Sequence, residues 1–550
     1  MTAASRSPRG ADALAAALIA AGVRRLFTLS GNHIMPVFDA ALGAGIELVH
    51  VRHEAAAVHM ADAWARLTGE VGVALVTGGP GHANAVSALY TAAMAESPVL
   101  LLSGHAPNGQ RGMGAFQEMR QADIAAPLCK SSRTVASPAE LVGDLAKAMR
   151  TARAGRPGPV HLSLPQDVLD PPAASASMAA AGDFQPPTQL LDALSAEAFL
   201  AMLRAAKRPL IIGGPAACTA KGRARAAQLE RASGVPVVGT ESPRGVADPA
   251  LGAFAEVLAQ ADAVLLLGKR LDFTLRFGKV PAFDAGCVFA QCDPESAEID
   301  RTRRAVGERL RVHAVADWDP AVDALVAATE GSFIGDAGWC QSVREAVAYR
   351  PAEWRAATSK HPGRLHPAQA LLPLQAILDE SPDSVLVSDG GEIGQWAQAC
   401  LHAPHRVVNG MAGSIGAGLP FALAARLAKP HAPVIAVMGD GTFGFHPAEI
   451  DTAVRHGLPF VCVVGNDERW NAEYQIQLRD YGPERLVGCE LLPTRYDQVA
   501  IAFGGHGELV TRAEDVRPAA RRAIASGKPG VLNVMVEGLA APTTRRPGGA

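Results

Sequence analysis

Two aspartates in the last third of the chain each follow a short apolar run. Asp440 lies between two glycines directly after residues 434–438, and Asp467 comes shortly after residues 460–464. Both runs are typical of buried parallel strands. Because the carboxyl ends of parallel strands meet at one edge of a sheet, we expect both aspartates there. Glycines let a phosphate approach backbone N–H groups, and two carboxylates with phosphate oxygens suit Mg²⁺, so the pattern predicts a phosphate and magnesium site.

A third acidic residue, Glu54, stands at a junction between a strand and a helix. The apolar run 48–51 ends a predicted strand, and a helical pattern opens near Glu54 and continues to Gly69. One interpretation is a first-turn glutamate favoured by the helix dipole. The other is an acid that moves a proton during catalysis. The second interpretation depends on the Asp440 region, since a Gly-Asp-Gly turn alone is also common in ordinary loops.

The segment from Gly439 to Asp467 resembles the diphosphate and metal signature of thiamine-diphosphate-dependent enzymes, in which Gly-Asp-Gly is followed, after one helix, by Asn-Asn. Asp467 stands where the second asparagine is usual. The resemblance implies that the side chains of Asp440 and Asp467 and the main-chain carbonyl of Arg469 bind Mg²⁺. The run Arg-His-Glu-Ala-Ala-Ala around Glu54 resembles the catalytic glutamate motif of the same enzymes, which implies that Glu54 contacts the aminopyrimidine ring of the cofactor.

Four more matches extend the resemblance along almost the whole chain, and they are found at residues 76–84, 114–118, 154–162 and 413–418. Their order is that of the acetolactate synthase, benzaldehyde lyase and 2-hydroxyacyl-CoA lyase branch. The resemblance implies that Ile415 wedges the cofactor into a bent shape. The full set of implied cofactor-binding residues is Glu54, Gly79, Asn84, Gly391, Glu392, Gly413, Ile415, Gly439, Asp440, Gly441, Thr442, Asp467 and Trp470.

Three further residues are candidates for contact with the substrate. His33 follows the first predicted strand, where benzaldehyde lyase has a functional histidine, although a solvated loop histidine or a helix cap is the alternative. Gln117 matches a glutamine that hydrogen-bonds a substrate oxygen. Glu473 comes one helical turn after the metal ligands, and it is either a proton-transfer group, its pKa raised by burial, or an exposed helix glutamate. The implied catalytic residues are Glu54, His33, Gln117 and Glu473.

The implied reaction is carbon–carbon bond formation or cleavage by an acetolactate-synthase-like 2-oxoacid decarboxylase or carboligase. The alternative is a 2-hydroxyacyl-CoA lyase or a benzaldehyde-lyase-type enzyme, which residues 271–278 resemble. A non-enzymatic alternative is an inactive metabolite-binding homologue, which the acidic Glu54 and Asp440 disfavour. The path from Pro243 to the strand at Ala263 lacks room for the flavin loop of acetolactate synthases, which argues against FAD. The glycines at 413–418 lack the spacing of a dinucleotide fingerprint.

Strands and helices alternate through most of the chain, which predicts an α/β protein of three doubly wound parallel-sheet domains. By resemblance these are a pyrimidine-binding, a central and a diphosphate-binding domain. A Pro/Gly/Arg-rich tail is expected to fray. The predicted boundaries are 1–170 for the N-terminal domain, 171–189 for a linker, 190–330 for the central domain, 331–365 for a second linker, 366–540 for the C-terminal domain and 541–550 for the tail.

Composition excludes several classes of protein. The chain has 550 residues, 49% of them hydrophobic and 19% charged, which predicts a well-buried globular protein. A net charge of −3 gives no footprint for nucleic acid or anionic membranes, and no apolar run is long enough to span a bilayer. The first ten residues lack the apolar core of a signal peptide, and the eight cysteines are scattered, so we expect a cytoplasmic enzyme. The predicted partners are a small-molecule 2-oxoacid, 2-hydroxyacyl or aldehyde substrate and identical subunits in a homodimer or homotetramer.

Overall fold

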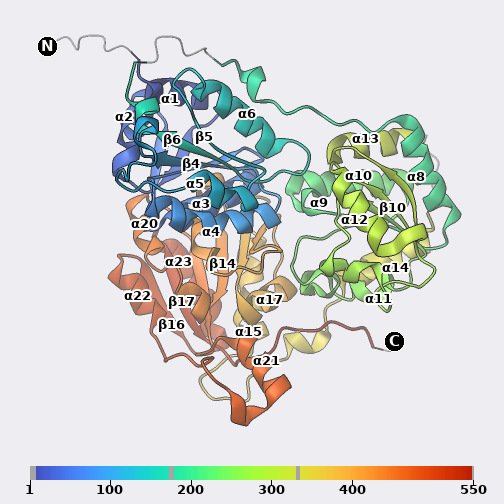
Figure 1. Ribbon diagram of the computed structural model, residues 1–550. Helices are drawn as coiled ribbons and strands as arrows, with labels where there is room; N and C mark the ends of the chain where they lie inside the picture. Colours follow the sequence, from blue (N-terminus) through green and yellow to red (C-terminus); the bar gives the residue numbers. More distant parts are fainter. Residues whose placement is uncertain (1–7, 173–178, 330–334, 548–550) are drawn as a thin grey trace.

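Three parallel β-sheets, each with its own helices, make up the computed structural model, which describes residues 8–172, 179–329 and 335–547. The predicted α/β fold with three parallel-sheet domains is confirmed. Figure 1 shows the N-terminal and C-terminal domains stacked on one another and the central domain beside them. Parts of the predicted start, linkers and tail, at 1–7, 173–178, 330–334 and 548–550, lie outside the described residues.

The N-terminal domain is built on a six-stranded sheet of order β2-β1-β3-β4-β6-β5. Its central strands, β3 and β4, are buried along their whole length, as their valine and leucine content predicts. The strands are β1 (Arg25–Thr28), β2 (Glu47–His50), β3 (Gly72–Val76), β4 (Val99–His105), β5 (Ser131–Thr134) and β6 (Val160–Pro165). The helices are α1 (Gly10–Ala20), α2 (Met35–Ala44), α3 (Glu54–Thr68), α4 (Pro80–Met94), α5 (Gln121–Ala125), α6 (Leu141–Arg153) and α7 (Gln166–Leu169).

The C-terminal domain repeats this topology with the order β13-β12-β14-β15-β17-β16. Its strands are β12 (Val385–Asp389), β13 (His405–Val408), β14 (Val434–Gly439), β15 (Val461–Asn466), β16 (His506–Val510) and β17 (Gly530–Met535). Its helices are α15 (Pro367–Leu371), α16 (Gln375–Leu378), α17 (Gly391–Cys400), α18 (Gly418–Ala428), α19 (Asp440–Phe443), α20 (Glu449–Arg455), α21 (Asn471–Tyr481), α22 (Tyr496–Ala502) and α23 (Ala513–Ala525).

Two features of this sheet create the position for a ligand. Strands β14 and β15 are paired in parallel with Gly439 opposite Gly465, so Asp440 and Asp467 leave the same edge. The chain order also reverses between β12 and β14, because β13 lies on the other side of β12. Loops diverge at such a switch point and leave a crevice at the carboxyl ends of the strands.

The central domain has a five-stranded sheet of order β11-β10-β9-β7-β8. Its strands are β7 (Pro209–Gly213), β8 (Val237–Gly239), β9 (Ala263–Leu267), β10 (Val288–Cys292) and β11 (Leu310–Ala314). Its helices are α8 (Ala193–Ala205), α9 (Pro215–Cys218), α10 (Ala220–Ser233), α11 (Phe254–Leu258), α12 (Ser296–Val306), α13 (Trp318–Ala328) and α14 (Ala337–Ala348).

Helix α14 departs from the expectation that residues 331–365 form a surface connection. Its Trp339 and Val343 are buried in the same apolar cluster as the central strands, and the Trp339 indole N–H donates to the carbonyl of Pro209 at 2.8 Å. The residues on either side of the helix in the segment are mostly polar, and they concealed its apolar face in the sequence. The exact domain boundaries remain predictions.

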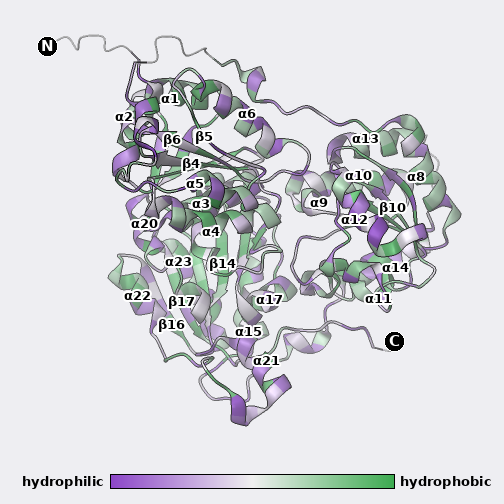
Figure 2. Cartoon of the chain, viewed as in Figure 1, coloured by the Kyte–Doolittle hydropathy of each residue, from purple (hydrophilic) through white to green (hydrophobic). Residues whose placement is uncertain are grey.

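The N-terminal and C-terminal domains share one hydrophobic core. Helix α3 packs along α18, and a single cluster of buried residues includes Val58 and Met60 from α3 and Phe421 from α18. Figure 2 shows hydrophobic strands and facing helices inside these domains, with hydrophilic residues gathered on outer helices such as α21. The start of α3, where Glu54 lies, is therefore held against the C-terminal domain.

The tail after β17 is ordered as far as it is described, so the expectation of a frayed tail is wrong for residues 541–547. The Asn471 side chain donates to the carbonyl of Leu539 at 3.0 Å, and the Trp396 indole donates to that of Ala540 at 3.0 Å. Further along, the backbone N–H and side chain of Arg546 donate to Glu256 of the central domain at 2.8 and 2.7 Å. Figure 1 shows the tail crossing from the C-terminal domain towards α11. Side-chain hydrogen bonds to its backbone compensate for a composition that suggests disorder.

Candidate functional site

A cavity of about 300 Å³ lies at the switch point of the C-terminal sheet. Most of its wall comes from that domain, and the loop with Pro243 and Arg244 closes one side from the central domain. It gathers most of the residues predicted for the cofactor and the metal. These are Gly391, Glu392, Gly413, Ile415, Gly439, Asp440, Gly441, Thr442, Asp467, Arg469 and Trp470, together with the predicted catalytic Glu473.

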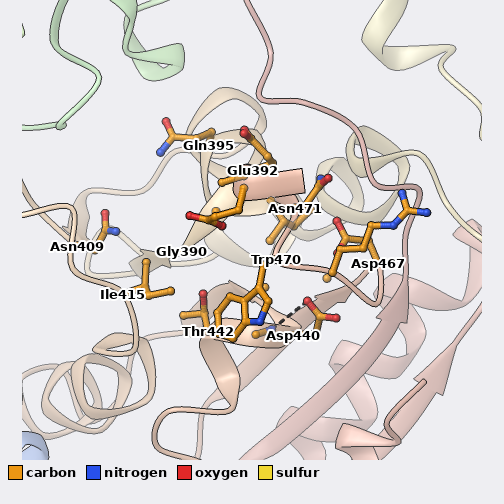
Figure 3. A pocket seen from close by; sticks show the side chains of 18 of the residues that line it. Gly390, Glu392, Gln395, Asn409, Ile415, Asp440, Thr442, Asp467, Trp470 and Asn471 are labelled. Carbon is orange, nitrogen blue, oxygen red and sulfur yellow. Dashed lines mark hydrogen bonds between the residues drawn. The ribbon is translucent and has the colours of Figure 1, made fainter. Parts of the chain in front are cut away.

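Asp440 and Asp467 lie on the same side of this cavity (Figure 3). The Asp440 carboxylate accepts the N–H of Gly441 through Oδ1 at 2.9 Å, whereas its buried Oδ2 has no hydrogen-bond partner. Burial raises the pKa of Asp440 to about 6, and burial together with the nearby Asp440 raises the pKa of Asp467 to about 8. Two neighbouring buried carboxylates are stabilised by a cation between them. Within the described residues no group of three His, Cys, Asp or Glu side chains forms a metal site, so these two would need other oxygen ligands.

Glycines give the opposite wall of the cavity its shape. Gly391 has φ +32° and Gly413 has φ +66°, and a Cβ on either would meet nothing within 4 Å. Their backbones therefore face open space that a ligand can enter. Gly441 is different, because a Cβ there would lie 2.6 Å from the Trp470 ring. Trp470 thus packs directly on the Gly-Asp-Gly turn and fixes the position of Asp440.

Asp389, which the sequence analysis did not select, holds the loop that carries Ile415. Its Oδ2 accepts the N–H groups of Gly416 at 3.0 Å and Gly418 at 2.6 Å. The carboxyl is buried, and burial raises its pKa to about 7. Its position at the end of β12, directly before two glycines, is a signal that could have identified it.

Glu54 begins α3 and is only 9% exposed. Its Oε2 accepts a hydrogen bond from the Asn84 side chain on α4 at 3.0 Å, and a Cβ at Gly81 would lie 3.4 Å from its Oε1. The predicted pair of Glu54 and Asn84 is thus brought together, with Gly79 at the start of the same helix. Among the described residues, however, none from the N-terminal domain lines the cavity around Asp440.

His33 and Gln117 lie in the same domain as Glu54. His33 is 2% exposed, its Nδ1 is 3.3 Å from the Thr77 hydroxyl, and its ring stacks on Phe116. This burial lowers its pKa and excludes the solvated loop histidine. Gln117 has φ +57°, and its backbone is so close to Gly79 that a Cβ on that glycine would lie 2.8 Å from the Gln117 Cβ. A strained residue of this kind is often found at functional loops.

Glu473 lines the cavity from the first turn of α21, yet it is exposed to solvent. Glu392 is the more buried carboxylate of the cavity, at 7% exposure, and burial raises its pKa. Its Oε2 accepts the N–H of Ala541 in the tail at 2.6 Å. The environment expected for Glu473, a buried carboxyl with a raised pKa, is therefore found at Glu392.

Comparisons with known proteins agree with this arrangement. Models of thiamine pyrophosphate enzyme domains match the chain in order, the N-terminal TPP binding domain over residues 8–124, the central domain over 196–325 and the C-terminal TPP binding domain over 389–534. The chain belongs to the thiamine pyrophosphate enzyme family. The resemblance found in the sequence is thereby confirmed.

Relatives of two named activities are similar to this family member over nearly their whole length. An acetolactate synthase large subunit of Mycobacterium tuberculosis is 33% identical over 548 residues, which covers 98% of this chain and 97% of that protein. A 2-hydroxyacyl-CoA lyase 2 of Homo sapiens is 33% identical over 591 residues, covering 96% and 90%. The Caenorhabditis elegans 2-hydroxyacyl-CoA lyase 2 is 31% identical over 598 residues, covering 98% and 90%.

The cavity of this thiamine pyrophosphate enzyme fits its family's cofactor. The unpartnered Oδ2 of Asp440 and the raised pKa of Asp467 call for a cation, and the open faces of Gly391 and Gly413 leave room for a diphosphate. The apolar Ile415 lies on the other side of the cavity from both aspartates (Figure 3). The residues present can therefore hold a charged diphosphate at one end and an organic ring towards the other.

Besides Asp389, which lies behind the cavity wall, four polar side chains that line the cavity escaped the sequence analysis. Gln395 and Asn471 lie on helices, Asn409 follows β13, and Arg244 belongs to another domain. Gln395 follows Glu392 by three residues on α17, so helical spacing was a usable signal for it. Asn471 is the first residue of α21, directly after Trp470. Asn409 and Arg244 reach the cavity only through tertiary packing.

Proposed function

We propose that this enzyme uses thiamine diphosphate and Mg²⁺ to decarboxylate a 2-oxo acid and join the remaining acyl group to a second carbonyl compound, as an acetolactate-synthase-like carboligase. The observation that carries the proposal is the cavity in which Asp440 and Asp467 stand together beside the glycine backbones. The similar acetolactate synthase of Mycobacterium tuberculosis supports the reaction class.

In the proposed site, Mg²⁺ is held by the carboxylates of Asp440 and Asp467 and the main-chain carbonyl of Arg469. An aspartate at 467 adds charge to the metal site and strengthens its preference for a divalent cation. The backbone at Gly441 and Thr442 lies at the start of α19, where N–H groups face a diphosphate. When bound, thiamine diphosphate supplies a nucleophilic carbon that attacks the substrate carbonyl.

The N-terminal residues supply proton transfer and orientation. Glu54 has one oxygen held by Asn84, which leaves its Oε1 directed past Gly81 for contact with the cofactor ring. His33 is kept neutral by its lowered pKa, so it can orient a substrate oxygen without adding charge. Gln117 offers an amide to the same oxygen. Closure of these residues over the cavity excludes water from the reacting atoms.

A 2-hydroxyacyl-CoA lyase or benzaldehyde-lyase-type activity is the second candidate. The buried position of His33 favours it, because the resemblance to benzaldehyde lyase predicts a functional histidine there. The human 2-hydroxyacyl-CoA lyase 2 is as similar to this chain as the acetolactate synthase, at 33% identity.

A substrate panel separates the two candidates. The purified enzyme, loaded with thiamine diphosphate and Mg²⁺, is given pyruvate with and without 2-oxobutanoate, benzaldehyde, or a 2-hydroxyacyl-CoA. The products are followed by mass spectrometry and CO₂ release. Release of CO₂ with a 2-hydroxy-3-oxo acid product supports the carboligase. Cleavage of the 2-hydroxyacyl-CoA between its carbonyl carbon and C2, to formyl-CoA and an aldehyde, or benzoin formation without CO₂ supports the second candidate, and no turnover with any member contradicts both.

We also propose that the active unit is a homodimer or homotetramer and that the enzyme is cytoplasmic, as the scattered cysteines favour. Glu54 does not line the cavity of its own chain, which supports the proposal that a neighbouring chain brings its Glu54 to it. The test mixes inactive Glu54→Gln chains with inactive Asp440→Ala chains under subunit exchange. Mixed dimers then regain one intact site and about a quarter of the activity returns. If no activity returns, both residues act within one chain.

A further inference from the structure

The cavity has a second polar end, away from the two aspartates, that no part of the proposed reaction uses. Figure 3 shows Gln395 and Asn409 there, across the cavity from Asp467, with Glu392 between the two ends. Arg244 closes this end from the central domain. The residues at this end are called the vestibule below, and they are Arg244, Glu392, Gln395 and Asn409.

The guanidinium of Arg244 makes no hydrogen bond among the described residues. Its side chain is 44% exposed, and the nearest carboxylate oxygen, Glu392 Oε2, is 3.7 Å from its Nη2, which is beyond hydrogen-bond distance. Within the described chain its guanidinium makes no closer polar contact. The other arginine of the cavity, Arg469, is engaged differently, because its guanidinium lies 4.1 Å from the centre of the Tyr474 ring.

The loop that carries Arg244 is rigid. Gly245 has φ +54°, and a Cβ there would lie 2.0 Å from the carbonyl oxygen of Thr274. The backbone N–H of Arg244 also donates to the hydroxyl of Ser242 at 3.2 Å. A guanidinium on a fixed backbone loses less entropy when it pairs with an anion.

Gln395 gives an independent sign of a ligand. Its residue is 7% exposed, it lines the cavity, and its buried Oε1 has no hydrogen-bond partner. A buried amide oxygen without a donor is costly, since it loses its bond to water and gains none in return. A substrate that offers an N–H or O–H group at this place would remove that cost.

Glu392 compensates the charge of Arg244 only in part. The closest atoms of the two side chains are 3.7 Å apart, and the same Oε2 accepts the N–H of Ala541 at 2.6 Å. The guanidinium of Arg244 therefore keeps N–H donors that can pair with another anion.

We propose that the vestibule recognises a substrate with a second anionic group, a carboxylate or a phosphate, beyond the reacting carbonyl. Arg244 binds that anion as a fork, and Gln395 accepts a hydrogen bond from the part of the substrate that leads to it. This inference rests on the proposed function, because it assigns the substrate class of the same cavity. It disfavours small neutral aldehydes and simple alkyl 2-oxo acids as the best substrates.

The test compares substrates that differ only in charge. One pair is 2-oxoglutarate and its terminal amide, and the other is a 2-hydroxyacyl-CoA with and without the ribose 3′-phosphate. The ratio of kcat/KM for the charged over the less charged member is measured for the wild type, Arg244→Met, Arg244→Lys and the control Arg231→Met. Arg231 is an exposed arginine on α10 of the same domain.

The wild type is expected to prefer the charged member of one pair by about ten- to hundredfold, and that pair identifies the anion as carboxylate or phosphate. Arg244→Met removes this preference, Arg244→Lys keeps part of it, and Arg231→Met keeps all of it. A ratio near one for both pairs in the wild type overturns the inference. A ratio in Arg244→Met that equals the wild-type ratio overturns it as well.

Two further measurements keep this failure distinct from failure of the proposed function. The dissociation constant of thiamine diphosphate is measured for each variant, and a loss confined to Arg244→Met would assign Arg244 to the cofactor and overturn the inference. If the wild type binds the cofactor but turns over no substrate, the proposed function fails. In that case calorimetry gives the dissociation constant of each substrate for the loaded wild type and for Arg244→Met. The ratio of these constants within each pair then decides the inference in place of the kcat/KM ratio.

Discussion

The carboxyl edges of the C-terminal and central sheets differ in how their charges are compensated, although both sheets are parallel and doubly wound. At the C-terminal edge, burial and the nearby Asp440 raise the pKa of Asp467, and Asp440 Oδ2 has no hydrogen-bond partner. At the central edge, Asp293 follows β10 and is paired with the buried Arg156, which the N-terminal domain contributes. The C-terminal edge thus has a cavity with like charges that need a ligand, whereas the charges at the central edge are paired with each other.

The central edge holds further compensated charges. Arg156 also pairs with Glu96, and Arg270 at the end of β9 is 3.4 Å from Glu298. Lys269, at 1% exposure, donates to the Thr274 hydroxyl at 2.9 Å. These groups join the central domain to the N-terminal domain and occupy the place where such sheets bind nucleotides. The expectation that the enzyme uses no FAD stays a prediction, and this packing supports it.

The largest effect is expected at Glu54, which tests whether the N-terminal edge belongs to the same site. Glu54→Gln should lower turnover about 10²–10⁴-fold, because an amide can hydrogen-bond the cofactor ring but cannot take its proton. Thiamine diphosphate binding should persist, since Asp440 and Asp467 are intact. Steady-state kinetics and calorimetry of the variant measure both, with the exposed Glu308→Gln as the control. Turnover close to that of the wild type would remove Glu54 from the mechanism.

Asp440→Ala should weaken the binding of the cofactor without lowering the stability of the fold. The diphosphate and the remaining Asp467 would repel each other without a well-held Mg²⁺, so thiamine diphosphate affinity should fall at least about tenfold to hundredfold. The cofactor-free variant should unfold at a temperature no lower than the wild type, because a repelled buried carboxylate has been removed. Calorimetry with and without EDTA and thermal unfolding measure the two parts. Unchanged, EDTA-resistant binding would mean that the metal site is elsewhere.

The residues at the carboxyl edge of the C-terminal sheet could be predicted from the sequence because their sequence signals are local. Asp440 and Asp467 each follow a strand, and paired parallel strands necessarily bring them together. The vestibule could not be predicted from the sequence, since Arg244 belongs to another domain and Gln395 is distinguished only by an Oε1 without a hydrogen-bond partner. The ordered tail was missed for a similar reason, because distant side chains such as Trp396 hold its backbone.

Arg156→Met should have the opposite effect to Asp440→Ala. It should lower the stability of the fold without weakening the binding of the cofactor. It leaves the buried Asp293 without a cation and Glu96 with only Arg270 at 3.9 Å, and breaking a buried pair typically costs about 3–5 kcal/mol. Chemical denaturation should show the loss, whereas the thiamine diphosphate affinity of the folded protein should stay within error of the wild type. A variant of normal stability with weakened cofactor binding would reverse the roles assigned to the two edges.

The smallest effect is expected at Glu449, a buried carboxyl between the N-terminal and C-terminal domains. Unlike Asp293, it forms no ion pair in the described part of the chain, although Arg455 is near enough to lower its pKa slightly. It accepts the Arg52 N–H at 3.1 Å and the Thr452 hydroxyl at 2.7 Å. Burial is the main cause that raises its pKa from 4.5 to about 7. The folded protein therefore binds more protons at Glu449 than the unfolded chain between these pH values. Its contribution to stability is complete below pH 4.5 and is lost as pH rises to about 7.

Glu449→Gln removes this pH dependence while the amide oxygen can still accept the Arg52 N–H. Between pH 4.5 and 7 the free energy of unfolding of the wild type should fall by about 1–3 kcal/mol more than that of the variant. Other buried carboxyls such as Asp389 titrate in the same range, so the difference between the two proteins, measured by denaturation at each pH, isolates Glu449. Parallel curves would mean that its carboxyl is already ionised in the folded enzyme, and that charge at this interface is compensated as it is at Asp293.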